Sequence, residues 1–131
     1  MGIATSVSAR STCDRLHVGA VIVSRDKHIL CTGYNGSIAG LDHCDNVGHL
    51  IEDDHCVRVI HAEINAVAHA AYNGVSLRKS TCYVTAMPCW NCFKALINSG
   101  ISIIKYRGIY KPDNKTTDAL WKLHDIKMVQ I

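Results

Sequence analysis

Short apolar runs separated by polar turns predict several β-strands. The run from Val18 to Val23 is uninterrupted and rich in β-branched residues, which is typical of a buried strand. A polar turn at 24–27 separates it from a second expected strand over 28–34, and so tight a connection predicts an antiparallel hairpin. Later apolar segments predict three further strands, over 81–86, 101–106 and 126–131.

Apolar positions at intervals of three and four predict helices between these strands. This spacing recurs from 60 to 71, and Asn73-Gly74 is a typical helix end. Other helices are expected over 3–12, from Pro88 to Ser99-Gly100 and over 116–123. Because helices and strands alternate after the hairpin, the order predicts a three-layer α/β/α fold. Its mixed sheet would have about five strands, the later ones mostly parallel. We expect a single domain over 1–131.

The segment from Ser37 to His55 has no hydrophobic periodicity and is filled with Gly, Asp, His and Cys. A loop of this length inside a compact domain is usually functional, or is held by something other than an apolar core.

Composition limits the classes of partner. With 48% hydrophobic residues among 131, the chain is expected to fold rather than to be disordered. The formal net charge of +3 provides no broad basic patch, so we expect no nucleic-acid partner. No apolar run is long enough to span a bilayer, so we expect no membrane partner. Seven cysteines, eight histidines and no signal-like N-terminus favour a cytoplasmic protein with reduced thiols and bound metal.

Two short motifs carry the chemistry: His61-Ala62-Glu63 and Pro88-Cys89-Trp90-Asn91-Cys92. One histidine and two cysteines can hold zinc while its fourth tetrahedral position stays open, which is the arrangement of a catalytic site. Each motif is predicted to begin a helix, where free N–H groups and the helix dipole favour thiolate over thiol. The sequence therefore predicts catalytic zinc bound by His61, Cys89 and Cys92.

Glu63 is not expected to be a fourth ligand. On a regular helix it projects about 200° around the axis from His61, so it can stand beside the open metal position. Zinc lowers the pKa of a bound water molecule to about 7. A neighbouring carboxylate can pass the water's proton to a ring nitrogen and then to a leaving amine. This chemistry suits hydrolytic removal of an amino group, with Glu63 as the catalytic residue.

The two motifs have other meanings when they occur separately. Cys-x-x-Cys alone is typical of a redox pair or of half a structural zinc site, and His-x-Glu alone indicates very little. Their joint occurrence in this order, each at the start of an expected helix, favours the catalytic zinc.

Several further segments accompany the two motifs. They are Arg10-Ser11-Thr12-Cys13, Val18-Gly19-Ala20, Gly33-Tyr34-Asn35-Gly36, Asn65-Ala66 and Tyr83-Val84-Thr85. With these segments the chain resembles the cytidine and deoxycytidylate deaminase superfamily over most of its length. It is most similar to the deoxycytidylate deaminases, including the small viral and bacterial ones. The resemblance implies a cytidine-deaminase-like fold and zinc-dependent deamination of dCMP to dUMP and ammonia, which feeds thymidylate synthesis.

The resemblance also implies substrate contacts. Asn35 is expected to hydrogen-bond the sugar, although an Asn-Gly turn alone would also explain this residue. Ala62 and Pro88 are expected to line the base pocket. The phosphate needs a partner, for which the candidates are Arg10 and Tyr110, followed by Lys111 and Arg107. A charged side chain near a strand end is, however, commonly only solvated.

Deaminases of this kind are commonly hexamers that dCTP with Mg²⁺ activates and dTTP inhibits. The resemblance therefore implies a homo-oligomer with an effector site. The expected effector-binding residues are Lys27, Tyr34, Gly36 and Asp42. The Gly-Tyr-Asn-Gly segment would couple this site to the substrate site.

A second metal site is expected around the segment from Ser37 to His55. Several family members carry a structural zinc built from such a loop. Its ligands here would be Cys13, Cys44, His49 and Cys56, with His55 as the alternative to Cys56. Otherwise these are ordinary buried cysteines and exposed histidines, as Cys31 and Cys82 inside strands are expected to be.

The residues leave two other functions open. One is a deaminase for free cytidine, a tRNA adenosine or a pterin-like ring, because the lining of the pocket decides the substrate. The other is a non-catalytic zinc-binding module. Glu63 discriminates between a deaminase and such a module, since a structural zinc site does not need this carboxylate.

Overall fold

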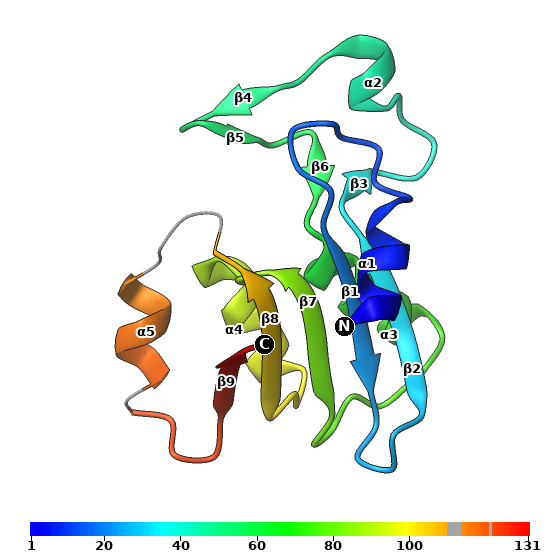
Figure 1. Ribbon diagram of the computed structural model, residues 1–131. Coiled ribbons are helices and arrows are strands. Elements are labelled where there is room, and N and C mark those ends of the chain that lie inside the picture. Colours follow the sequence, from blue (N-terminus) through cyan, green and yellow to red (C-terminus); the bar gives the residue numbers. More distant parts are fainter. Residues whose placement is uncertain (110–113, 121) are drawn as a thin grey trace.

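A five-stranded mixed sheet forms the centre of the protein, whose computed structural model describes residues 1–109, 114–120 and 122–131 (Figure 1). The strand order is β2-β1-β7-β8-β9. The strands are β1 (Gly19–Val23), β2 (Ile29–Tyr34), β7 (Thr81–Ala86), β8 (Ile103–Gly108) and β9 (Lys127–Gln130). Strand β1 is antiparallel to both β2 and β7, whereas β7, β8 and β9 are parallel. The predicted mixed sheet with parallel later strands is therefore confirmed.

Helices cover both faces of this sheet. Helix α1 (Gly2–Ser8) lies on one face, and α3 (Ala62–Tyr72) and α4 (Trp90–Asn98) lie on the other (Figure 1). Helix α5 (Asn114–Leu120) contacts α4 at the β9 edge. The main core lies between the sheet and the pair α3 and α4, and its largest fully buried side chains are Phe93, Ile22, Leu96, Ile101 and Ile104. Among the described residues, no helix is both long and apolar enough to cross a membrane.

Two glycines let the helices approach the sheet closely. A Cβ at Gly19 would lie 2.6 Å from the backbone nitrogen of Ser8 in α1. On the other face, a Cβ at Gly33 would lie 2.5 Å from the backbone nitrogen of Ala66 in α3. Real side chains do not make such contacts with backbone atoms. Strand β2 therefore fixes the position of α3, whose first residues belong to the candidate site.

The segment expected to be an irregular loop contains short regular elements. Helix α2 (Cys44–Val47) lies within it. Strand β3 (Gly36–Ser37) pairs with β6 (Val59–Ile60), and β4 (Ile51–Glu52) pairs with β5 (His55–Cys56). We call residues 37–60 the ligand loop. Two-residue strands need only backbone pairing, so they leave no hydrophobic periodicity in the sequence.

The opening helix was predicted to extend to residue 12, which is wrong. Helix α1 ends at Ser8, since the chain beyond it makes contacts with a distant segment. The backbone nitrogen of Thr12 donates to the carbonyl oxygen of Asn35 at 3.2 Å. The backbone nitrogen of Ser37 donates to the hydroxyl of Thr12 at 3.0 Å. These hydrogen bonds hold residue 12 outside the helix.

Candidate active site

The beginnings of α3 and α4 supply the predicted catalytic zinc ligands. His61 and Cys89 are the N-cap residues of these helices, with extended backbone angles of φ −66° and ψ 150°, and φ −69° and ψ 167°. Neither residue makes a side-chain capping hydrogen bond. Cys92 lies in the first turn of α4. The ligand atoms of the three residues all lie within 4.8 Å of one another.

This group has the dimensions of a zinc site. The Nδ1 atom of His61 is 3.6 Å from the Sγ atom of Cys89 and 3.3 Å from that of Cys92. Tetrahedral zinc, with bonds of about 2.3 Å to sulfur and about 2.0 Å to nitrogen, separates such atoms by about 3.5 Å. One nitrogen and two sulfurs are also donors that zinc prefers. The group therefore fits zinc and offers it three ligands.

Hydrogen bonding shifts the pKa values of the two cysteine side chains in opposite directions. The Cys92 side chain, followed by that of His61, lowers the pKa of Cys89. The same contact with Cys89, followed by burial, raises the pKa of Cys92. The hydrogen bond with Cys89 also raises the pKa of His61, against the effect of burial. The thiolate form that metal binding requires is thus favoured at Cys89 by its own neighbours.

Glu63 lies beside this group as the second residue of α3. It is only 4% exposed, and burial raises the pKa of its carboxyl group because the charged form is moved out of water. Its own backbone N–H and the charge of His61 act in the opposite direction. A carboxylate with a raised pKa takes up a proton more readily near neutral pH.

A cavity of about 300 Å³ opens onto Glu63 and two of the ligands, His61 and Cys89. This volume is at the lower end of the range for small-molecule sites. The lining residues come from the segment between α1 and β1, from the ends of β2 and β7, from the starts of α3 and α4 and from the ligand loop: Cys13, Arg15, Leu16, Val18, Asn35, Asp54, His55, Cys56, Val59, His61, Ala62, Glu63, Met87 and Cys89. The predicted catalytic residues therefore face a space that can hold a small substrate.

Asn35 organises one wall of this cavity. Its Oδ1 atom accepts a hydrogen bond from the backbone nitrogen of Val18, and its Nδ2 atom donates to the carbonyl oxygen of Leu16, both at 2.7 Å. The side chain of Asn65 in α3 donates to the carbonyl oxygen of Tyr34 at 2.8 Å and so fixes the residue before Asn35. Asn35 therefore has a structural role, and its expected contact with the sugar stays a prediction.

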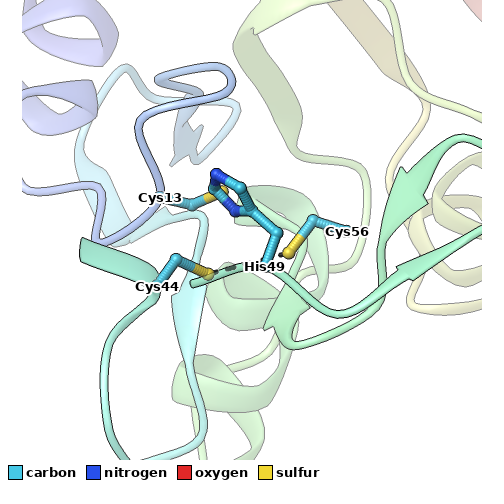
Figure 2. A group of neighbouring side chains, drawn as sticks. All are labelled: Cys13, Cys44, His49 and Cys56. Carbon is cyan, nitrogen blue, oxygen red and sulfur yellow. Dashed lines mark hydrogen bonds between the residues drawn. The ribbon is translucent and has the colours of Figure 1, made fainter. Parts of the chain in front are cut away.

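A second group of potential ligands lies next to the same cavity. It consists of Cys13, Cys44, His49 and Cys56, whose ligand atoms all lie within 4.8 Å of one another (Figure 2). The Sγ atom of Cys13 is 3.6 Å from Nδ1 of His49, and the Sγ atoms of Cys44 and Cys56 are 3.6 Å apart. Three sulfurs and one nitrogen could complete a tetrahedron without an open position. The structure thus groups Cys56 with the other three, whereas His55 lines the cavity outside this group.

Known proteins resemble the chain in both sequence and structure. The family model named "Cytidine and deoxycytidylate deaminase zinc-binding region" matches residues 1–107. The chain belongs to the cytidine and deoxycytidylate deaminase family. This assignment confirms the predicted enzyme class, a hydrolytic deaminase, and the predicted fold.

The relatives of this deaminase include bacterial and phage proteins. ComE operon protein 2 of Bacillus subtilis is 50% identical over 105 residues, which cover 80% of this chain and 55% of the relative, so the chain spans about half of that protein. The deoxycytidylate deaminase of Enterobacteria phage T2 is 33% identical over an alignment of 167 residues, covering 98% of this chain and 88% of the relative. A crystal structure of dCMP deaminase from the cyanophage S-TIM5, in complex with dCMP and dUMP, matches with a TM-score of 0.83 and 29% identity. The match covers 99% of this chain and 92% of the phage chain.

Only some of the remaining predicted substrate contacts line the cavity. Ala62 lines the cavity, whereas Pro88 is fully buried between two lining residues, Met87 and Cys89. Arg10 is exposed and lies outside the lining. Tyr110, with its neighbour Lys111, falls outside the described residues.

The four expected effector-binding residues do not come together within one chain. Tyr34 and Gly36 flank Asn35 at the end of β2, and Asp42 is exposed in the ligand loop. Lys27 lies in the turn between β1 and β2, at the opposite end of the hairpin (Figure 1). The six residues of β2 separate the two ends by about 17 Å, at about 3.3 Å per residue.

Arg15 is a cavity residue that the sequence did not indicate. Its Nη2 atom lies 3.3 Å from Oδ1 of Asp54 and 3.2 Å from the carbonyl oxygen of the same residue. Both residues line the cavity, together with His55. In the sequence, the one feature that could have pointed to Arg15 is its position two residues after the expected ligand Cys13.

Cys31 and Cys82 behave as expected of ordinary buried cysteines. Both are buried within strands, and neither belongs to a metal-binding group. Burial raises the pKa of Cys31 to about 11 and that of Cys82 well above its usual value. Their thiols therefore stay protonated at neutral pH.

Proposed function

We propose that this deaminase converts dCMP and water to dUMP and ammonia, with zinc held by His61, Cys89 and Cys92. One observation carries the proposal: Glu63 and two of these ligands face a cavity that Asn35 and Arg15 also line. The likeness to a phage dCMP deaminase in complex with dCMP and dUMP supports dCMP as the substrate. The product would feed thymidylate synthesis.

The side chains divide the reaction between them. Zinc supplies the activation of a water molecule by lowering its pKa to about 7. Glu63 accepts the water's proton and donates it to the ring nitrogen next to the amino-bearing carbon, which makes that carbon easier to attack. The new carbon–oxygen bond forms there. Glu63 then takes the remaining proton from the attached hydroxyl group and passes it to the amine, and the carbon–nitrogen bond breaks as ammonia leaves and the carbonyl forms. The raised pKa of Glu63 suits a group that must both take and give a proton.

Arg15 is our candidate for the phosphate contact. A guanidinium group carries five N–H donors in a planar arrangement that suits phosphate oxygens. Asp54 contacts one end of this group and would keep it directed along the cavity wall. His55 lines the same part of the cavity and is a second group that can donate to a phosphate. This assignment replaces the exposed Arg10 as the first choice.

The decisive experiment compares Glu63→Gln with the matched control Glu52→Gln, since Glu52 is exposed in β4. Ammonia release from dCMP should fall by a factor of about 10²–10⁴ in Glu63→Gln, because an amide cannot carry the proton. Zinc content should stay at the wild-type level, and Glu52→Gln should retain full activity. Undiminished turnover in Glu63→Gln would overturn the mechanism.

A substrate panel tests the choice of dCMP. Ammonia release should be fastest with dCMP and much slower with deoxycytidine, cytidine, dCTP or dAMP. Preference for cytidine or for an adenine compound would identify a different deaminase of the same family. Zinc binding without turnover of any substrate would favour a non-catalytic zinc-binding module.

We also propose regulation and assembly on the family resemblance. The deaminase would be a cytoplasmic hexamer that dCTP with Mg²⁺ activates and dTTP inhibits. Tyr34 and Gly36 support this coupling because they flank the cavity residue Asn35. Lys27 would reach such a site only from another chain. All seven cysteines are free, as suits a reducing compartment. Hyperbolic kinetics that ignore both nucleotides, or a monomer in light scattering, would contradict this proposal.

A further inference from the structure

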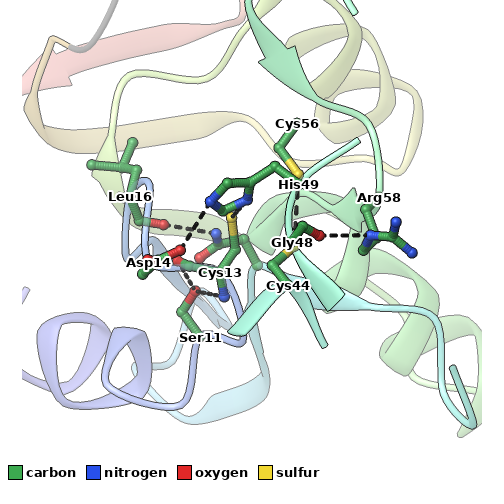
Figure 3. Close-up of polar contacts among 10 residues, drawn as sticks. Ser11, Cys13, Asp14, Leu16, Cys44, Gly48, His49, Cys56 and Arg58 are labelled. Carbon is green, nitrogen blue, oxygen red and sulfur yellow. Dashed lines mark hydrogen bonds and ion pairs between the residues drawn. The ribbon is translucent and has the colours of Figure 1, made fainter. Parts of the chain in front are cut away.

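His49 stands between a potential metal position and a carboxylate. Its Nδ1 atom is 3.6 Å from the Sγ atom of Cys13, and its Nε2 atom is 3.1 Å from Oδ1 of Asp14 (Figure 3). A histidine that binds metal through one ring nitrogen commonly donates its other N–H to a carboxylate, which fixes the tautomer and the ring orientation. Asp14 occupies that place here. Its side chain is 73% exposed, so packing does not explain its position.

The backbone beside two of the ligands is also fixed. The hydroxyl of Ser11 donates to the carbonyl oxygen of Cys13 at 3.2 Å. The Nε atom of Arg58 donates to the carbonyl oxygen of Gly48, the residue before His49, at 3.0 Å (Figure 3). Gly48 has φ +78°, a conformation that favours glycine. These contacts fix the backbone beside one ligand in each of the two segments.

The ligand loop has little apolar packing of its own. Six of its larger hydrophobic side chains are exposed, namely Ile38, Leu41, Val47, Leu50, Ile51 and Val57, and only Val59 and Ile60 at its end are half-buried. Cys44, in contrast, is 3% exposed, and it is a member of the ligand group. Segments with few buried apolar contacts open easily unless something else holds them. A metal ion among the four ligands would provide that hold.

Two separate segments of the chain connect this four-ligand group to the wall of the substrate cavity. Cys13 continues into the wall residues Arg15 and Leu16, and Cys56 continues from Asp54 and His55. Arg15 contacts Asp54 across the two segments. Cys44 and His49 are not lining residues. Because Cys13 and Cys56 themselves line the cavity, a metal bound here would tie two parts of its wall together.

We propose that Asp14 is a positioning residue that orients His49 as a ligand. Through it, metal bound to Cys13, Cys44, His49 and Cys56 clamps the two wall segments and so sets substrate affinity. The statement about affinity rests on the proposed dCMP deamination. The ligand geometry does not depend on that activity.

Three variants of exposed aspartates test the orienting role. Zinc content is measured for the purified protein, followed by the loss of zinc to a competing chelator. Wild-type protein and the control Asp45→Ala, an exposed aspartate of α2, should hold two zinc ions per chain equally well. Asp14→Ala should hold one of the two about tenfold more weakly. Asp14→Asn retains an oxygen acceptor and should fall between them. If Asp14→Ala retains both ions as tightly as wild type, the role of Asp14 is refuted.

Cys44→Ser tests the clamp, because any effect on the cavity must pass through the metal. It should contain one zinc ion per chain, and backbone amides in 13–18 and 53–60 should lose protection from hydrogen exchange. KM for dCMP should rise with little change in kcat. Unchanged exchange in a variant that has lost one zinc ion would refute the clamp. Hydrogen exchange is also measured in Asp14→Ala, where the changed side chain is exposed. Zinc content and hydrogen exchange can both be measured without turnover. A wild-type protein inactive on dCMP would thus overturn the proposed function alone.

Discussion

Replacing Gly33 with alanine should disturb the active site by displacing α3. A Cβ at this position would lie 2.5 Å from the backbone nitrogen of Ala66 and nearer still to the carbonyl oxygen of Ala62. Both are backbone atoms of α3, so no flexible side chain can move aside. Ordinary contacts of a Cβ begin near 3.4 Å, so α3 and β2 must separate by about 1 Å. Overpacking of this severity destabilises a protein by about 3 kcal/mol.

The displaced helix begins directly after His61 and carries Glu63. A shift of about 1 Å in catalytic groups can lower the rate by a factor of about 100. We therefore expect Gly33→Ala to lose about 3 kcal/mol of unfolding free energy in urea, measured at fixed protein concentration. Its kcat on dCMP should fall by about two orders of magnitude.

Gly2→Ala is the matched control for this prediction. A Cβ at Gly2 would meet nothing within 4 Å, and the residue begins α1 with an unstrained backbone. Its stability should stay within about 0.5 kcal/mol of wild type. If Gly33→Ala has wild-type stability and kcat, α3 is not fixed by its contact with β2, and the reasoning fails.

Three further changes test the site directly. Arg15→Ala should raise KM for dCMP while leaving deamination of the phosphate-free deoxycytidine unchanged; equal effects on both substrates would remove Arg15 from the phosphate contact. Asn35→Ala breaks two hydrogen bonds of 2.7 Å to the wall at Leu16 and Val18, so its unfolding free energy should fall by about 2 kcal/mol, and unchanged urea unfolding would contradict that role. Removal of zinc with 1,10-phenanthroline should abolish turnover, and added Zn²⁺ but not Mg²⁺ should restore it; activity that persists in zinc-free protein would exclude metal-assisted deamination.

The sheet could be predicted from the sequence because its signals are local. The apolar run of β1 and the polar turn after it lie in consecutive residues, and the structure pairs β1 with β2 as expected. The end of α1 could not be predicted in the same way. It depends on hydrogen bonds between Thr12 and residues 35 and 37, which are distant in the sequence.

The two groups of potential metal ligands could be predicted from the sequence because cysteine and histidine are rare residues. Their spacing also restricts the kinds of metal site that they can form. Arg15 had no such signal, since an arginine near the end of an irregular segment is usually solvated. Only the folding of Asp54 back onto it reveals its place in the cavity wall. The choice between His55 and Cys56 likewise depends on which side chain faces Cys44, and neighbouring residues in a strand face opposite ways.

The uncapped starts of α3 and α4 have a consequence for how the protein evolves. Serine, threonine, aspartate and asparagine are the residues that best stabilise a helix at the N-cap, by about 1 kcal/mol relative to a residue that leaves the amides unpaired. His61 and Cys89 occupy these positions and make no such bond. A lineage that no longer bound zinc at this site would therefore gain stability by replacing these two residues with polar caps. Such descendants would keep the fold and show their lost chemistry as polar caps at positions 61 and 89.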